Sequence, residues 1–328
     1  MLLPYDSADP ISKRAQLRRL LETAVGGTMA DGIQLSAGLD TSILATVAAR
    51  QGRRLIGVCV SVADGPGLDE PYAELVAKRL GLDLHVIRPK LSDLVEKMPA
   101  LIAILGTFDP MELRNSIAAY VALEKARDIG IRTVLTGDGA DELFAGYSYM
   151  LNMPPADLPK YIQHLNEVMY FSSRVVAPCL PIAVELPYVG DEIRSFALTL
   201  TTEDLVGEHE GKRLGKKILR EAFADILPDE ITWRVKTPIE FGSGSTALQK
   251  FAAEMIGDQE FDADRKSASE NDNVTIRDKE HLLYYRMYRQ IFPPPGEQPE
   301  GTKTCAQCYG PVPRLDMSFC RICGAYPI

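Results

Sequence analysis

The stretch Ile33-Gln34-Leu35-Ser36-Ala37-Gly38-Leu39-Asp40-Thr41-Ser42 decides the fold, because an apolar run ends here in a turn of small residues that opens a helix. The residues before Ser36 are strand-like, and the apolar residues after Thr41 recur at helical spacing. The turn therefore surrounds a helix N-terminus, where free backbone N–H groups and the helix dipole attract an anion. We expect a phosphate-binding loop.

The loop matches neither of the two common nucleotide fingerprints. It has no G-x-G-x-x-G, and it has no G-x-x-x-x-G-K-[ST] with its lysine. Instead Asp40 lies in the loop, and a carboxylate beside phosphates is expected chiefly where a Mg²⁺ ion separates them. The alternative is an ordinary helix start with Asp40 near its N-cap.

A second glycine-containing loop follows a short apolar strand at Ile131 to Leu135. It reads Thr136-Gly137-Asp138-Gly139-Ala140-Asp141-Glu142-Leu143-Phe144-Ala145-Gly146-Tyr147 and contains three carboxylates. Acidic loops are usually solvated surface. Because apolar residues flank this one on both sides, we expect it to line a cleft at the carboxyl ends of parallel strands.

Both loops resemble motifs of one enzyme family. The first resembles the pyrophosphate loop of the N-type ATP pyrophosphatases, Ser-Gly-Gly-x-Asp-Ser, with Ala37 in place of the first glycine. The second resembles the second ATP-site motif of the asparagine synthetases. The resemblance covers residues 11 to 292 and implies a doubly wound α/β fold with a mostly parallel sheet, a nucleotide-binding half at 11–150 and a helical acyl-substrate half at 151–292.

The resemblance also implies roles for individual residues. Asp40 would hold Mg²⁺, and Lys236 in the segment Trp233-Arg234-Val235-Lys236 would reach the ATP phosphates, although a surface lysine is the alternative. Lys217 and Arg220 are weaker candidates for the phosphates. The other expected residues of the ATP site are Leu35, Ser36, Gly38, Leu39, Thr41, Ser42, Val60, Gly137 and Asp138. Those expected on the acyl-substrate side are Arg114, Asp138 and Glu142, with Asp141 as a further catalytic residue.

One segment departs from the family pattern. Asparagine synthetases have Gly-Val-Glu-x-Arg-x-Pro-Phe-Leu-Asp where this chain has Pro181 to Asp191, and the gapless register places Ala183 at the glutamate and Gly190 at the aspartate. Glu185 as catalytic glutamate and Asp191 as second Mg²⁺ ligand would replace them if the backbone shifts. Otherwise the acyl substrate differs from aspartate.

The resemblance implies an ATP-dependent amide ligase that forms AMP and pyrophosphate and activates a small-molecule carboxylate as an acyl-adenylate. The chain leaves no room for a glutaminase before residue 36, so the nitrogen would come from free ammonia, from a separate glutaminase, or from an amine on another substrate. Two alternatives stay open. One is a related pyrophosphatase that modifies tRNA or another macromolecule, and the other is a nucleotide-binding regulator that has lost catalysis.

The composition is that of an ordinary globular protein. The 328 residues are 46% hydrophobic and 25% charged, and the net charge of −9 argues against a large nucleic-acid surface. Because the sequence contains neither a membrane-spanning apolar stretch nor a signal peptide, we expect a cytoplasmic protein. Residues 257 to 280 are polar, which predicts a mobile surface loop.

The cysteines predict a second, smaller unit. Cys59 and Cys179 are expected to be buried thiols in a strand and an apolar loop. The remaining four form two C-x-x-C pairs, Cys305 with Cys308 and Cys320 with Cys323, which predicts a structural Zn²⁺ site of four thiolates. We therefore expect a zinc ribbon at 303–328 after a proline-rich linker at 293–302. It would either cap the first domain, which spans 1–292, or dock a macromolecule.

Overall fold

The computed structural model describes residues 10–298 and 301–328. Its centre is a five-stranded, entirely parallel sheet with the strand order β3-β2-β1-β4-β5. The strands are β1 (Gly32–Gln34), β2 (Ile56–Val60), β3 (Asp83–Ile87), β4 (Thr133–Leu135) and β5 (Ala183–Glu185). The strand order reverses direction at β1, as in other doubly wound sheets, and this confirms the expected fold class.

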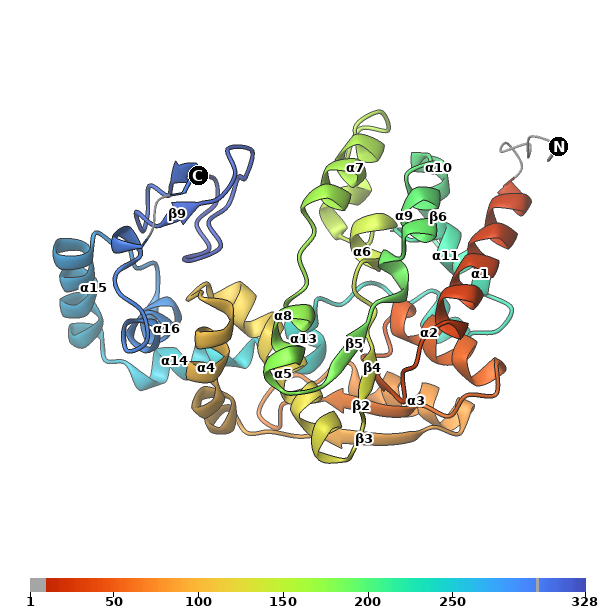
Figure 1. The fold of residues 1–328 in the computed structure, drawn as a ribbon, viewed down its shortest axis with the longest axis horizontal. Helices are drawn as coiled ribbons and strands as arrows, with labels where there is room; N and C mark the ends of the chain where they lie inside the picture. The colour runs from red at the N-terminus through yellow and green to blue at the C-terminus, as the bar shows by residue number, and fades with distance from the viewer. Residues whose placement is uncertain (1–9, 299–300) are drawn as a thin grey trace.

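Helices cover both faces of the sheet (Figure 1). Those of the first half are α1 (Pro10–Gly26), α2 (Leu39–Arg50), α3 (Glu70–Leu80), α4 (Leu91–Leu105), α5 (Pro110–Asp128) and α6 (Ala140–Leu143). Those that follow are η1 (Ser148–Asn152), α7 (Leu158–Val168), α8 (Ser172–Cys179), η2 (Pro187–Val189), α9 (Asp191–Ala197), α10 (Thr202–Leu205), α11 (Lys217–Phe223), α12 (Asp229–Thr232), α13 (Ile239–Ser243), α14 (Ala247–Met255), α15 (Asp258–Asp272), α16 (Lys279–Arg289) and η3 (Pro295–Glu297). Two antiparallel pairs complete the fold: β6 (Gly207–His209) with β7 (Lys212–Leu214), and β8 (Lys303–Thr304) with β9 (Pro311–Val312).

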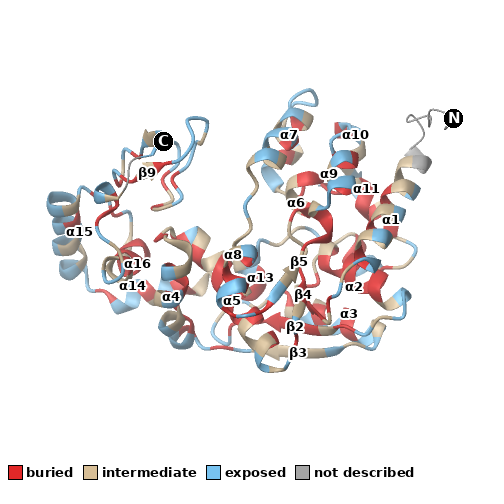
Figure 2. Ribbon diagram, viewed as in Figure 1, coloured by how far each residue is buried: buried red, intermediate tan, exposed pale blue. Residues whose placement is uncertain are grey.

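The sheet separates two hydrophobic cores, because successive side chains of a strand point to opposite faces. In β2, Cys59 belongs to the core that contains α1 and α2, whereas Val58 and Val60 belong to the core that contains α4, α5 and α16. Neighbouring residues of β4 divide in the same way. The buried residues accordingly concentrate in the strands and the inner helix faces (Figure 2).

The C-terminal unit packs against the second of these cores. Its four clustered cysteines belong to the same apolar cluster as the tyrosines of α16, and Figure 1 shows this unit and α15 at the end of the molecule opposite α1. Two expectations about local structure were wrong. Residues 258–272 form α15, a helix whose only buried residue is Ala268, and Cys179 is exposed at the end of α8. Cys59 is buried, as expected.

No helix within the described ranges has both the length and the apolar character that a membrane crossing requires.

Candidate active site

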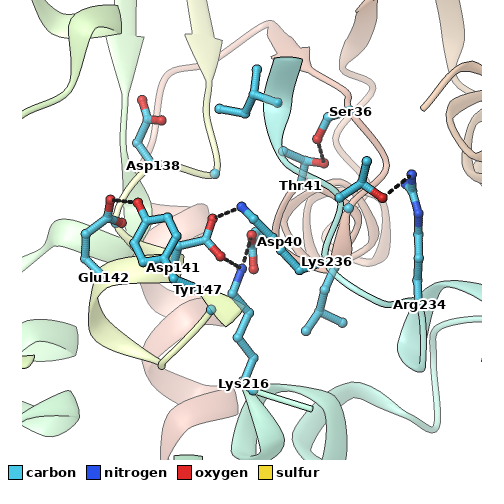
Figure 3. Close-up of a pocket in the computed structure, with 18 of the residues that line it drawn as sticks. Ser36, Asp40, Thr41, Asp138, Asp141, Glu142, Tyr147, Lys216, Arg234 and Lys236 are labelled. Carbon is cyan, nitrogen blue, oxygen red and sulfur yellow. Dashed lines mark hydrogen bonds and ion pairs between the residues drawn. The ribbon is translucent and has the colours of Figure 1, made fainter. Parts of the chain in front are cut away.

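The two glycine-containing loops meet because β1 and β4 are neighbours in the sheet and run in the same direction. Their contact is close: a Cβ atom added to Gly137 would lie 3.1 Å from the Asp40 Cβ and 3.1 Å from the Thr41 Cγ2. Beside this contact lies a cavity of about 260 Å³ (Figure 3). Its lining includes Ser36, Gly38, Leu39, Asp40, Thr41, Gly137, Asp138, Asp141, Glu142, Lys216, Arg234 and Lys236.

The first loop presents the N-terminus of α2 to this cavity. Gly38 is the N-cap residue, and no side chain caps it. Ala37 has a φ of +49°, a left-handed conformation that favours glycine, so the alanine occupies a position whose backbone suits the family's glycine. The Ser36 and Thr41 hydroxyls lie 3.3 Å apart, and the buried Ser42 Oγ has no hydrogen-bond partner among the described residues.

Four charged side chains form the floor of the site (Figure 3). The Lys216 ammonium lies 2.5 Å from Asp40 Oδ2 and 2.6 Å from Asp141 Oδ1, and the Lys236 ammonium donates to the other Asp141 oxygen. Asp40 Oδ1 is buried and has no hydrogen-bond partner among the residues described. This oxygen is free for a further cation.

The burial of these groups shifts their pKa values in different directions. Burial raises the pKa of Asp40 although Lys216 opposes the shift. Burial also acts to raise the pKa of Asp141, but Lys216 and Lys236 together hold that pKa well below its ordinary value. The pKa of Lys216 is raised, because attraction to Asp141 and Asp40 outweighs the burial that would lower it. Lys216 is therefore a cation and Asp141 an anion at neutral pH.

Lys216 is the residue that the sequence-based reasoning missed in favour of its neighbours. It precedes α11 with a φ of +58°, and only 4% of the residue is exposed. Lys217 points elsewhere and donates to the Glu203 carbonyl, whereas the buried Arg220 donates to the carbonyls of Gly215 and Thr232. The structure shows why Gly146 lies beside Lys216: a Cβ there would lie 1.8 Å from Asp141 Oδ1 and 2.5 Å from Lys216 Cε, so the glycine makes room for this ion pair.

The remaining two carboxylates of the acidic loop are tied to neutral donors. Asp138 accepts hydrogen bonds from Ser173 at 2.5 Å and from Thr136 at 2.9 Å. Glu142 accepts one from the Tyr147 hydroxyl at 2.6 Å. Burial raises the pKa of both carboxylates, and these hydrogen bonds oppose the rise.

Arg234 fixes the segment that carries Lys236. Its guanidinium donates to the Ala37 carbonyl at 3.1 Å and to Asp69 at 2.7 Å, and it lies 3.8 Å from the ring centre of Tyr72. Arg234 thus joins the first glycine loop to α3, and Lys236 follows two residues later beside Asp141.

Several residues expected in the site lie outside the cavity. Leu35 and Val60 are buried in the two cores behind it. Arg114 forms an ion pair with Glu280 at 2.5 Å, and the next residue, Asn115, lines the cavity instead. Glu185 accepts a hydrogen bond from the Met29 backbone at 3.0 Å, and Asp191 is almost fully exposed, 3.6 Å from Arg194.

The segment that departs from the family pattern reaches the site through another residue. Tyr188 is fully buried, and its hydroxyl donates to the Asp40 backbone carbonyl at 3.1 Å. Neither Glu185 nor Asp191 lines the cavity, so this segment contributes support for the first glycine loop through Tyr188.

The four cysteines of the C-terminal unit suit one tetrahedral metal ion. All four Sγ atoms lie within 4.8 Å of one another, with Cys305 and Cys323 at 3.8 Å and Cys308 and Cys320 at 3.7 Å. A Zn²⁺ ion with four Zn–S bonds of about 2.3 Å has sulfur atoms about 3.8 Å apart. The donor set and its spacing therefore fit zinc.

Comparison with known proteins identifies the family of the chain. The family model "Asparagine synthase" matches residues 16–176 and 181–304. Asparagine synthetase B [glutamine-hydrolyzing] of Escherichia coli (strain K12) is 28% identical over 89% of this chain and 56% of its own length. The "Probable asparagine synthetase [glutamine-hydrolyzing]" of Dictyostelium discoideum is 27% identical over 80% of this chain and 52% of its own length.

Among solved structures, NMN synthetase from Francisella tularensis is 13% identical with a TM-score of 0.39, over 87% of this chain and 97% of that one. The chain spans about half the length of the curated relatives it matches. Because the family model matches most residues of this chain, the chain belongs to the asparagine synthase family.

Proposed function

We propose that this protein is an ATP-dependent amide ligase that forms AMP and pyrophosphate. The observation that carries the proposal is the group of Asp40, Lys216, Asp141 and Lys236 at the N-terminus of α2. It combines a helix end that suits an anion, two cations and a carboxylate oxygen that has no hydrogen-bond partner among the residues that the structure describes. A nucleoside triphosphate with its magnesium ion requires these groups.

The reaction has two steps. A carboxylate oxygen of the acyl substrate attacks the α-phosphorus of ATP, the bond from that phosphorus to the bridging oxygen breaks, and pyrophosphate leaves. The nitrogen of ammonia or another amine then attacks the acyl carbon, loses a proton and displaces AMP. Positioning and charge stabilisation account for most of such catalysis.

The residues of the site divide between these tasks. Ser36, Gly38 and Ser42 would hold the pyrophosphate, with Leu39 and Thr41 in the same turn. Asp40 would hold Mg²⁺, which when bound neutralises phosphate charge. Lys236, which is 28% exposed, would reach the phosphates from the side of the acidic loop. Lys216 would keep Asp40 and Asp141 in place.

The acidic loop and α8 would form the acyl-substrate side. Asp138, Glu142 and Gly137 line the cavity there, together with Asn115 and Ser173. The placement of Arg114, Glu185 and Asp191 gives no support to the direct roles expected for them. We propose ammonia as nitrogen donor, either free or from a separate glutaminase, a cytoplasmic location, and a structural zinc ion in the ribbon.

Phosphorus NMR of ATP incubated with the full chain, Mg²⁺, ammonium and a panel of carboxylates tests the proposal. We expect AMP and pyrophosphate to accumulate only with a carboxylate that fits, with L-aspartate as the first to examine. ADP and phosphate with every substrate, or ATP that binds and is never cleaved, would contradict it.

A further inference from the structure

The C-terminal ribbon contacts the main domain at several points, and two of these are the residues between its last pair of cysteines. These residues are Arg321 and Ile322, which lie between Cys320 and Cys323. The proposed metal ion would bind the cysteine on either side of these two residues. It would therefore hold the turn that meets the main domain. Two separate lines of contact lead from here to the cavity.

The first line of contact passes through α5. The Ile322 carbonyl accepts hydrogen bonds from the Phe108 backbone at 2.8 Å and from the Thr107 hydroxyl at 3.1 Å. Asp109 follows directly and caps α5, since its carboxylate accepts a hydrogen bond from the Met111 backbone at 3.1 Å. Two turns later, on the same helix, Asn115 lines the cavity. The ribbon thus sets the start of a helix that reaches the site.

The second line of contact passes through α8. The Arg321 guanidinium lies 4.4 Å from the ring centre of Tyr170, which precedes the cavity-lining residues 171–173. Of these, Ser173 donates to Asp138 at 2.5 Å. A cation over an aromatic ring is attracted to the face of the ring, so this contact restrains Tyr170 and the chain that follows it.

From these two lines we propose that the ribbon is a positioning unit for the acyl-substrate side of the cavity, with Arg321 as its main positioning residue. The metal site would fix the Cys320–Cys323 turn. This turn contacts Tyr170 and the start of α5. These two segments in turn position cavity-lining residues 171–173 and Asn115. The phosphate side depends on α2, α11 and Arg234 instead. The inference rests on the proposed function only in calling this part of the cavity the acyl-substrate side.

Hydrogen–deuterium exchange of the full, zinc-loaded chain tests this without any substrate. In Arg321→Ala we expect peptides covering 168–178 to exchange about two- to fivefold faster, the range that a cation–π contact provides. Peptides covering α2 should be unchanged. Arg321→Lys keeps a cation over the ring and should restore most of the protection.

Lys303→Met is the matched control, because this ribbon lysine donates to the carbonyls of Met317 and Ile328 within the ribbon itself. It should leave residues 168–178 as in the wild type. Metal analysis of each variant should show that zinc is retained. Removal of the metal with a chelator should speed exchange in both 105–113 and 168–178. Wild-type exchange at 168–178 in both Arg321→Ala and the metal-free protein would overturn the proposal.

A kinetic measurement gives an independent readout. With L-aspartate as the probe, Arg321→Ala should raise the KM for the carboxylate about two- to fivefold and leave the KM for ATP unchanged. Equal changes in both constants would point to a general loss of structure and contradict a role on one side of the cavity. If no carboxylate reacts, the proposed function fails, whereas the exchange result still decides this inference.

Discussion

At the scale of single residues, the site is a problem of buried charge. Asp40 and Asp141 come from different loops, and their side chains are only 15% and 17% exposed. Two carboxylates this close and this buried cannot both stay ionised without a cation, and Lys216 lies between them. The lysine is thus required both to assemble the site and to set its charge.

Asp40→Asn should lower the rate of pyrophosphate release by about a hundredfold or more, because the amide cannot neutralise a metal ion beside the phosphates. The fold should survive, since Asn keeps the shape of the side chain. The rate is measured by phosphorus NMR and the fold by circular dichroism. Pyrophosphate release at the wild-type rate would remove Asp40 from the mechanism.

The two lysines should separate stability from catalysis. Lys216→Met leaves two buried carboxylates without their shared cation and should cost about 3–5 kcal/mol in the free energy of unfolding. Lys236→Met should cost much less stability, because its side chain is 28% exposed, yet it should still slow the reaction strongly. Denaturant unfolding and rate measurements on both variants check this. Equal losses of stability would contradict the different roles.

At the scale of elements, α5 connects three parts of the molecule. Its N-cap Asp109 lies at the ribbon, Arg114 pairs with Glu280 of α16, and Asn115 lines the cavity. Adjacent residues of a helix point about 100° apart, which explains why Arg114 faces α16 while its neighbour faces the site. The register of one helix therefore decides which residue reaches the substrate.

The contact between α5 and α16 should depend on pH. Burial raises the pKa of Glu280 from 4.5 to about 7, against the opposing pull of Arg114. A raised carboxyl pKa means that the folded state binds the proton more tightly, so this contribution is full below about pH 4.5 and is lost as the pH rises through about 7.

Glu280→Gln removes this titration. The difference in unfolding free energy, variant minus wild type, should therefore increase by about 2–3 kcal/mol between pH 5 and pH 8. Chemical denaturation across that range, with zinc present throughout, measures it. A difference that stays constant with pH would show that Glu280 does not titrate there.

At the scale of the whole molecule, the ribbon packs into the hydrophobic core that contains α4, α5 and α16, so it is not an independently folded unit. Its cysteines pack in the same cluster as Tyr284, Tyr285 and Tyr288 of α16. A unit of this size cannot form a core alone, and a structural zinc ion contributes on the order of 10 kcal/mol to such folding. Loss of the metal should therefore also destabilise the part of the core outside residues 303–328.

Metal analysis should find about one zinc per chain. Chelation should lower the melting temperature and expose residues 293–302 to protease, while a fragment that contains the parallel sheet stays folded. Cys308→Ala should lose the metal. Cys179→Ala is the control, because this exposed cysteine lies outside the cluster and its loss should leave the zinc content unchanged. Full zinc content in Cys308→Ala would contradict the four-cysteine site.

The sequence by itself determined the two glycine loops, the apolar strand before each of them and the grouping of the cysteines, and the family resemblance implied the mostly parallel sheet. The loops, the strands before them and the cysteine pairs are each encoded by a few contiguous residues, because apolar runs, glycines and residue spacing predict local structure. The polar run at 257–280 shows the limit of such reasoning. Composition alone does not distinguish an exposed helix from a loop, and the structure has α15 there.

Only the tertiary structure decided which side chains meet. Lys216, Tyr188 and Arg321 come from segments far apart in the chain, and their partners depend on packing and on helix register. The same physics moved Arg114 toward α16 and left Asp191 in solvent. Charges in a buried site are neutralised by residues that are close in space and distant in the sequence. No local sequence pattern therefore predicts which residues pair.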